Sequence, residues 1–126
     1  MAVGACAIEP VDDTASGGLV ETSWTVVSID GAPTLPDSPP TLDFTPDGLS
    51  GTTGCNRYGG TFRTERDAFS AVLGVMTEID CDDPRSAQEA AFVAALAKVD
   101  RWRLREDGAL ELRGASTIVA RPAIAP

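Results

Sequence analysis

The sequence predicts an α+β fold, in which a mostly antiparallel, curved sheet or partly closed β-barrel of about eight short strands has one α-helix packed on it or plugging it. Three observations lead to this class. Short segments rich in β-branched and aromatic residues alternate with turn signals along most of the chain. A single segment late in the chain repeats apolar residues at helical spacing. A chain of 126 residues that is 43% hydrophobic has the size and apolar content of one domain.

The first predicted strands surround a proline-rich loop. Residues 23–29 (SWTVVSI) form a strand that ends at an Asp-Gly turn. Residues 32–40 contain four prolines and are expected to be loop throughout. Residues 41–45 and 49–53 are predicted to pair as a hairpin, because a Pro-Asp-Gly turn lies between them.

A second hairpin is predicted from alternating apolar residues. Residues 60–65 alternate around Phe62, and residues 68–73 alternate as Phe69, Ala71 and Leu73, so the two segments pair across Arg66-Asp67. Residues 75–79 are expected to continue the sheet.

The single helix is predicted to begin beside two acidic residues. Asp83 is its expected cap and Pro84 its expected first residue. The segment that follows lacks Gly and Pro and has an apolar stripe that must lie on the sheet: Phe92, Ala95, Leu96 and Val99. Three further strands complete the predicted domain, at residues 101–105, 110–112 and 117–120.

The charge of the chain limits its partners. It has 19 acidic and 10 basic residues, a formal net charge of -9, which repels a phosphate backbone and an anionic membrane surface. We therefore expect no nucleic-acid partner, and membrane contact only through a lipid anchor. No run of eighteen apolar residues exists in the sequence. A monomer is expected.

The N-terminal segment differs in composition from the rest. Residues 1–20 are expected to be a flexible tether, 21–122 the folded domain and 123–126 a tail. The small residues before Cys6 resemble the end of a bacterial lipobox, which makes Cys6 a candidate for lipidation. The alternative is a chance match, because the hydrophobic segment expected upstream is missing from the sequence.

Residues 50–60 (SGTTGCNRYGG) are the most unusual stretch of the chain. A phosphate-binding loop would need a lysine near residue 57, a cysteine nucleophile would need a base such as histidine, and zinc would need about four ligands. The chain has no histidine, so no catalytic, cofactor or metal residue is assigned. The stretch is instead predicted to be a corner of the sheet, where Gly54, Asn56 and Gly60 permit unusual backbone geometry and close approach.

The corner also carries a cysteine. Because Cys55 lies there and Cys81 lies just before the helix, we expect a disulfide that ties the sheet to the start of the helix. The alternative is two buried free thiols, as expected in a reducing cytoplasm.

Taken together, these residues resemble the META domain family, which includes HslJ-like heat-shock proteins. The resemblance covers about residues 21–121 and is carried by the Gly-Cys-Asn-Arg-Tyr core together with spaced Thr, Cys and Glu residues: Gly54, Cys55, Asn56, Arg57, Tyr58, Gly60, Thr77, Cys81 and Glu89. It implies a compact, mostly β domain with one helix. Family members are often envelope lipoproteins or secreted proteins, associated with heat shock, antibiotic tolerance and, in some parasites, virulence. The resemblance implies no catalytic set.

Three other features each have two interpretations. The carboxylates of Glu78, Asp80, Asp82 and Asp83 could bind calcium, or they could favour the helix start through its dipole. The stripe of Arg101, Arg103 and Arg105 could bind an acidic partner, or be a solvated face partly paired with Glu106 and Glu111. The aromatic residues Trp24, Tyr58, Phe62 and Trp102 could line a barrel mouth, or fill the core.

The preferred function is therefore a non-enzymatic domain of the cell envelope or the exterior, with a stress-related or protein-binding role. The alternative is a carrier of a lipid or small hydrophobic ligand in the barrel interior. A third hypothesis, an acid-base hydrolase built on a pair of carboxylates, has no particular residues in its favour.

Overall fold

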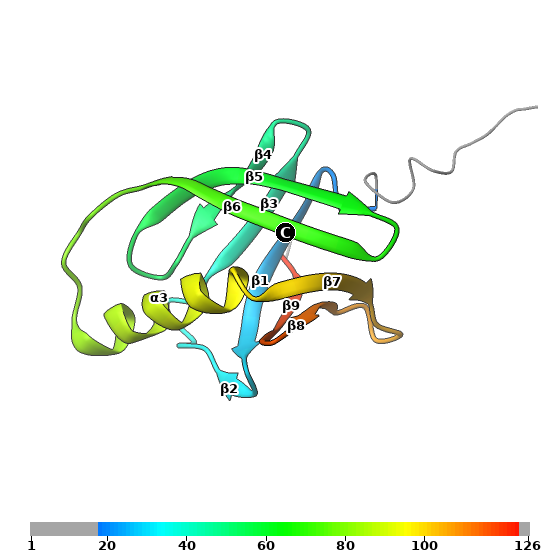
Figure 1. Ribbon diagram of the computed structural model, residues 1–126. Coiled ribbons are helices and arrows are strands. Elements are labelled where there is room, and N and C mark those ends of the chain that lie inside the picture. The colour runs from blue at the N-terminus through cyan, green and yellow to red at the C-terminus, as the bar shows by residue number, and fades with distance from the viewer. Residues whose placement is uncertain (1–17, 124–126) are drawn as a thin grey trace, which may run out of the picture.

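The computed structural model describes residues 18–123. It confirms the α+β prediction: within these residues nine strands form one antiparallel sheet, and a single helix lies beside it (Figure 1). The strands are β1 (Thr22–Ile29), β2 (Ala32–Pro33), β3 (Thr41–Thr45), β4 (Gly48–Thr52), β5 (Arg57–Glu65), β6 (Ala68–Met76), β7 (Val99–Leu104), β8 (Leu110–Gly114) and β9 (Thr117–Pro122), and the helix is α3 (Asp83–Leu96).

The sheet closes into a barrel. Its strand order is β2-β1-β3-β4-β5-β6-β7-β8-β9, and an additional pairing of β1 with β9 joins the first long strand to the last. β2 stands outside this ring and pairs only with the end of β1, so eight strands form the barrel. The prediction that residues 32–40 are loop throughout was wrong at β2, a two-residue pairing that the Asp-Gly turn after β1 brings about.

One junction of the barrel is weak, and the helix lies there. β6 pairs with β7 at the single position Ala68↔Arg101, whereas β5 and β6 pair along their length. α3 connects β6 to β7 in sequence (Figure 1). Its side chains Phe92, Ala95 and Leu96 are buried, and the ring of Phe92 lies 5.7 Å from that of Tyr58. The helix therefore plugs the barrel with three residues of the predicted stripe. The fourth, Val99, was wrongly placed on the helix and is the first residue of β7.

The interior of the barrel is filled by one hydrophobic core. Residues from every strand of the ring contribute to it, and Leu19, which precedes β1, joins them. The largest fully buried apolar side chains are Phe44, Phe92, Leu19, Leu42, Leu49, Leu110, Leu112, Ile118 and Val26. They alternate with outward-facing residues along the strands, as an antiparallel barrel requires.

The helix begins one residue earlier than predicted. Asp82, and not Asp83, is the cap: its side chain accepts a hydrogen bond from the backbone N–H of Arg85. Asp83 is the first helical residue, and Pro84 follows it in the first turn, where its missing N–H costs nothing.

The second hairpin differs from its predicted bounds. β5 begins at Arg57 instead of residue 60, and β6 ends at Met76, so residues 77–79 do not continue the sheet as expected. A register shift between Gly59 and Gly60 marks a bulge in this hairpin. A β-carbon at Gly60 would meet the carbonyl oxygen of Val72, so the two strands can approach this closely only with glycine there.

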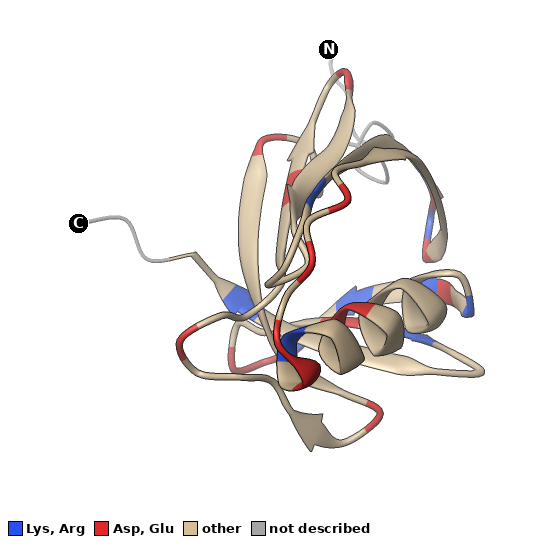
Figure 2. Cartoon of the chain, turned by 90° about the vertical axis from the view of Figure 1, so that its left-hand side faces the viewer, with Lys and Arg blue, Asp and Glu red and all other residues tan. Residues whose placement is uncertain are grey.

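Charged residues lie on the outside. Figure 2 shows Asp and Glu at turns and strand ends on several sides of the molecule. Among residues 18–123, no helix is long and apolar enough to cross a bilayer.

Candidate functional site

The corner between β4 and β5 is held by Thr53. This threonine is fully buried, and its hydroxyl oxygen accepts the backbone N–H groups of Cys55 (3.1 Å) and Asn56 (2.9 Å). The same hydroxyl donates to the Glu89 carboxylate on α3 at 2.8 Å. The turn is thus fixed by its own side chain and tied to the helix at the same atom.

Asn56 is the centre of the polar network. Its side-chain amide nitrogen donates to the Glu89 carboxylate at 2.9 Å, and it lies 3.3 Å from the Ile79 carbonyl oxygen and 3.4 Å from the sulfur of Cys55. Its amide oxygen accepts the Thr77 hydroxyl at 2.8 Å and the Ile79 backbone N–H at 2.6 Å. Asn56 is only 4% exposed, so these partners replace water at both ends of the amide.

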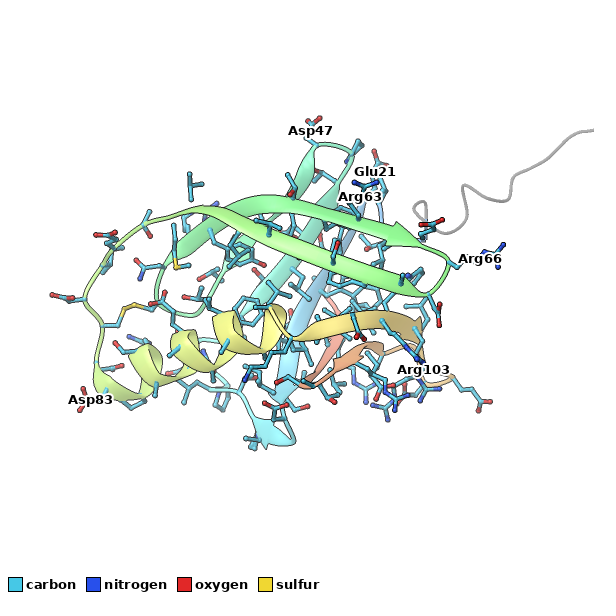
Figure 3. The ribbon with its side chains drawn as sticks, viewed as in Figure 1. Glu21, Asp47, Arg63, Arg66, Asp83 and Arg103 are labelled. Atoms are coloured by element: carbon cyan, nitrogen blue, oxygen red, sulfur yellow. A yellow bond between two sulfur atoms is a disulfide. The ribbon has the colours of Figure 1, made fainter. Side chains whose placement is uncertain are left out.

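A disulfide lies beside this network. Cys55 and Cys81 are bonded, with an S–S distance of 2.08 Å and a Cα–Cα distance of 6.0 Å (Figure 3). The bond links the corner to the segment just before α3, which is the pairing expected from the sequence, and not the alternative of two free thiols.

Gly54 brings a third segment to the corner. Its φ of +96° lies in the region that favours glycine, and a β-carbon there would meet the Gln88 side-chain nitrogen and the Ser38 carbonyl oxygen. Gln88 donates to the carbonyl oxygens of Ser38 (2.7 Å) and Thr53 (3.2 Å) and accepts the N–H of Leu35 at 2.8 Å. The loop between β2 and β3 is therefore fastened to the same helix.

We call the side chains that hold the corner together the corner clasp: Thr53, Cys55, Asn56, Thr77, Cys81, Gln88 and Glu89. The sequence indicated five of the seven; Thr53 and Gln88 were missed. Thr53 belongs to the unusual stretch, so its position could have singled it out. Gln88 could have been noticed as a polar residue four positions before Phe92, on the helix face that packs inward.

The remaining motif residues lie along β5. Arg57 has an exposed side chain, and its backbone N–H and carbonyl pair with the Thr77 hydroxyl and N–H, each at 3.0 Å. Tyr58 is buried and donates its hydroxyl to the Thr41 carbonyl oxygen at 2.6 Å. Burial raises the pKa of the Tyr58 phenol well above its ordinary value, and the negative charge of Asp43 raises it further.

The acidic residues near the helix start do not converge. In the described part of the chain, no three His, Cys, Asp or Glu side chains come together as a metal site would require. Asp82 caps α3 and lies 3.9 Å from the Arg85 guanidinium. Asp83 points away from the body at the first turn (Figure 3).

The four aromatic residues singled out in the sequence are placed differently from one another. Trp24 and Tyr58 are buried in the core, whereas Phe62 and Trp102 are half-buried against it. Phe62 packs edge-on against Phe44 with ring centres 4.7 Å apart. The Trp102 ring nitrogen donates to the Arg66 carbonyl oxygen at 2.9 Å. These side chains pack on the core and form no common mouth.

The arginine stripe continues across three strands. The basic face, as we call it, consists of exposed or half-buried outward residues on β7, β8 and β9 and of Arg105, which directly follows β7: Arg101, Arg103, Arg105, Arg113 and Arg121. The prediction that Glu111 pairs with the stripe is confirmed, because Arg103 (labelled in Figure 3) contacts it at 2.6 Å. That hydrogen bond lowers the pKa of Glu111. Among the described residues Glu106 has no ion pair.

Asp107, instead of the expected Glu106, is the second acidic residue that pairs with the arginines of the basic face. It lies 3.7 Å from Arg105 and 3.4 Å from Arg121. A hydrogen bond from the Ala109 backbone N–H, and then the two guanidinium groups, lower the pKa of the Asp107 carboxyl. The sequence alone did not point to this role of Asp107, because the contact with Arg121 depends on β9 lying next to β8.

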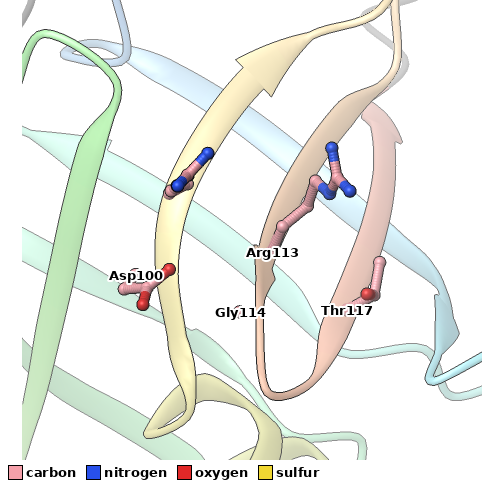
Figure 4. Close-up of a pocket in the computed structure, with 5 residues that line it drawn as sticks. Asp100, Arg113, Gly114 and Thr117 are labelled. Atoms are coloured by element: carbon pink, nitrogen blue, oxygen red, sulfur yellow. The ribbon is translucent and has the colours of Figure 1, made fainter.

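A pocket opens at one end of the basic face. It has a volume of about 350 Å³ and is lined by Asp100, Arg101, Arg113, Gly114 and Thr117 (Figure 4). Of these residues, only Arg101 is indicated by a pattern in the sequence.

A search of protein families found a match to the model described as the META domain, over residues 17–122. The chain belongs to the META domain family. A search of curated proteins returned no significant match.

Two solved structures resemble this META domain. One, titled as the NMR structure of a protein from Burkholderia xenovorans, superposes with a TM-score of 0.70 at 25% identity and covers 97% of this chain and 95% of its own. The other, also an NMR structure, has a TM-score of 0.66 at 20% identity, covers 83% of this chain and 92% of its own, and supports the fold alone.

Proposed function

We propose that this META domain is a non-enzymatic domain of the cell envelope or the exterior that binds another protein and supports the cell under stress. The observation that carries the proposal is the corner clasp. Its polar side chains are bonded to one another and to the backbone, and both of its cysteines are joined. Residues arranged in this way stabilise a fold and leave no side chain of the motif poised for general acid-base chemistry.

The disulfide supports the proposed location. Such bonds persist in oxidising compartments and are rare in the cytoplasm. Cys6, the candidate for lipidation, lies outside the described residues; in the proposal it anchors the protein to a membrane through the chain that precedes Leu19.

An unpaired strand edge at the β6–β7 junction, where α3 also lies, supports the protein-binding role. Beyond Ala68, β6 has no paired strand on the β7 side among residues 18–123, and it carries no charged residue that would block an incoming strand. Val72 and Val75 are 66% and 73% exposed on this strand. An extended segment of a partner protein can add to such an edge through backbone hydrogen bonds.

The carrier alternative gains no support from the barrel. A ligand-carrying barrel needs an apolar space of several hundred cubic ångströms, roughly 300 to 1,000 Å³. Here the interior is filled by core side chains such as Phe44, Leu110 and Leu112, each of which is at most 1% exposed to solvent.

Fractionation of the natural host tests the location. The native gene product is expressed from its own gene, and its thiols are labelled without reductant. We expect the protein in the envelope or the medium with Cys55 and Cys81 protected from labelling, and we expect Cys6→Ser to release it from the envelope. A cytoplasmic protein whose Cys55 and Cys81 both react would contradict the proposal.

Site-specific photocrosslinking tests the protein-binding role. A photoreactive residue replaces Val75 on the β6 edge, and a matched control places it at Ala94, an exposed position on α3. We expect a discrete adduct from position 75 that the control lacks and that Val72→Lys diminishes. Equal crosslinking from both positions would refute the role of the edge.

A further inference from the structure

We propose that Arg101 and Arg113 form an anion site that binds a phosphate group at the pocket in the basic face. The two arginines are directly opposite each other in the register of β7 and β8. The other three arginines of this face each have an acidic partner. Within residues 18–123, neither Arg101 nor Arg113 has an ion pair or a hydrogen bond through its side chain.

Like charges directly opposite each other in a sheet destabilise it. Glu111 forms its ion pair with Arg103 and attracts Arg113 only at longer range. The chain has 19 acidic residues, so a shortage of carboxylates does not explain why this pair has no ion-pair partner of its own. Of the arginines without an acidic partner, only these two face each other, because Arg63 lies opposite Ser70 and Arg57 opposite Thr52. A bound anion would relieve their repulsion.

The pocket provides a further donor. Thr117 on β9 is opposite Arg113 in register, so Arg101, Arg113 and Thr117 form one row across three strands. Figure 4 shows Arg113 and Thr117 on neighbouring strands at one side of the pocket. Within residues 18–123 the Thr117 hydroxyl has no hydrogen-bond partner, so it can donate to a ligand. The Thr117 backbone N–H donates to the Asp30 carboxylate at 2.9 Å, a negative group that weakens anion binding on this side.

The charges of the pocket favour phosphate over carboxylate. Two guanidinium groups and a hydroxyl match a phosphate monoester, which carries nearly two negative charges on three acceptor oxygens, whereas a carboxylate carries one charge on two. The Asp100 carboxylate also lines the pocket, on the β7 side in Figure 4, and weakens anion binding there. The net charge of -9 opposes a polyanion, so we assign a single phosphate group and not a nucleic acid.

Titration of the isotopically labelled 126-residue chain with inorganic phosphate tests the site. The readout is the NMR signals of the arginine side-chain N–H groups and of Thr117, at constant ionic strength set with chloride. We expect saturable shifts at Arg101, Arg113 and Thr117. Arg101→Gln and Arg113→Gln should each weaken the apparent affinity about fivefold or more, and Asp100→Asn should strengthen it.

Arg63→Gln is the matched control, because it removes the same charge from an exposed position on β5. It should leave phosphate binding unchanged. The proposal is overturned if chloride alone reproduces the shifts, or if the variants at Arg101 and Arg113 bind phosphate as the control does.

The phosphate can be a free ion or the headgroup of a lipid, and a second measurement separates the two. Vesicles of phosphatidylcholine with phosphatidic acid, which presents a phosphate monoester, are compared with pure phosphatidylcholine by sedimentation. Binding of inorganic phosphate without vesicle binding assigns the free ion. Vesicle binding that Arg113→Gln abolishes, and Arg63→Gln does not, assigns the headgroup.

Discussion

Asn56 shows how far a single residue can be interpreted from the sequence. An asparagine between glycines predicts a turn residue, and the backbone of Asn56 does close a turn with Thr53. The unusual backbone geometry expected of Asn56 is wrong, because its φ is not positive and its side chain bonds distant segments. Its contacts with Thr77 and Glu89 join positions 21 and 33 residues away. No local pattern specifies such partners; they were indicated only by the family resemblance, as motif residues of unstated role.

Tyr58 gives a prediction at the same scale. Its buried hydroxyl donates to the Thr41 carbonyl oxygen, so Tyr58→Phe should lower the free energy of unfolding by about 1 kcal/mol. Urea unfolding at neutral pH measures this difference. A variant as stable as the parent would mean that the hydrogen bond contributes nothing.

The raised pKa of Tyr58 adds a pH dependence. The folded-state pKa lies above the unfolded value of about 10, so the phenol's contribution is complete below about pH 10 and is lost as the pH rises through the folded-state pKa. The parent should therefore lose more stability than Tyr58→Phe above about pH 10, as unfolding at a series of pH values will show.

At the scale of elements, the sequence predicted strand bounds best where a strong turn signal lies between two strands. The Pro-Asp-Gly signal placed the β3–β4 hairpin within a residue of its ends. The β2 pairing was missed because two residues, one of them proline, give no alternation to read. The helix start was misplaced by one residue because Asp82 and Asp83 are equally good caps in sequence, and only the backbone angles decide between them.

The disulfide gives the prediction at this scale. It closes a sequence separation of 26 residues, for which the chain-entropy account gives about 3 to 4 kcal/mol. Replacing Cys55 and Cys81 together by serine should lower the free energy of unfolding by about this amount while the fold is retained, because the hydrogen bonds of Asn56 and Thr53 remain. Urea unfolding checks the first expectation and circular dichroism the second. Unchanged stability would show that the bond does not constrain the chain.

At the scale of the molecule, closure of the barrel depends on contacts between the two ends of the domain. The sequence predicted a curved sheet or a partly closed barrel. The pairing of β1 with β9 shows that the barrel is closed. This pairing could not be derived locally, because it joins strands from opposite ends of the domain. The pocket does not depend on this closure: Arg101 and Arg113 are opposite each other in the pairing of the consecutive strands β7 and β8, but the sequence did not specify the register of that pairing.

Oligomeric state is predicted at this scale too. The barrel has a complete core of its own, and the chain carries a net charge of -9, so we expect a monomer of 13.1 kDa. Sedimentation velocity measures the mass. A dimer that Val72→Lys dissociates would show that the β6 edge pairs with a second copy instead of another protein.

The central claim is that the family motif builds the corner clasp and so stabilises the domain. The most direct test is the free energy of unfolding of Asn56→Ala, measured by urea titration with the disulfide intact. The change removes the buried Asn56 amide and leaves the half-buried Glu89 carboxylate and the Thr77 hydroxyl without their shared partner. We expect a loss of about 1 to 3 kcal/mol in a protein that still folds as a barrel. A stability within about 0.5 kcal/mol of the parent, the range usual for changes at exposed positions, would contradict the claim.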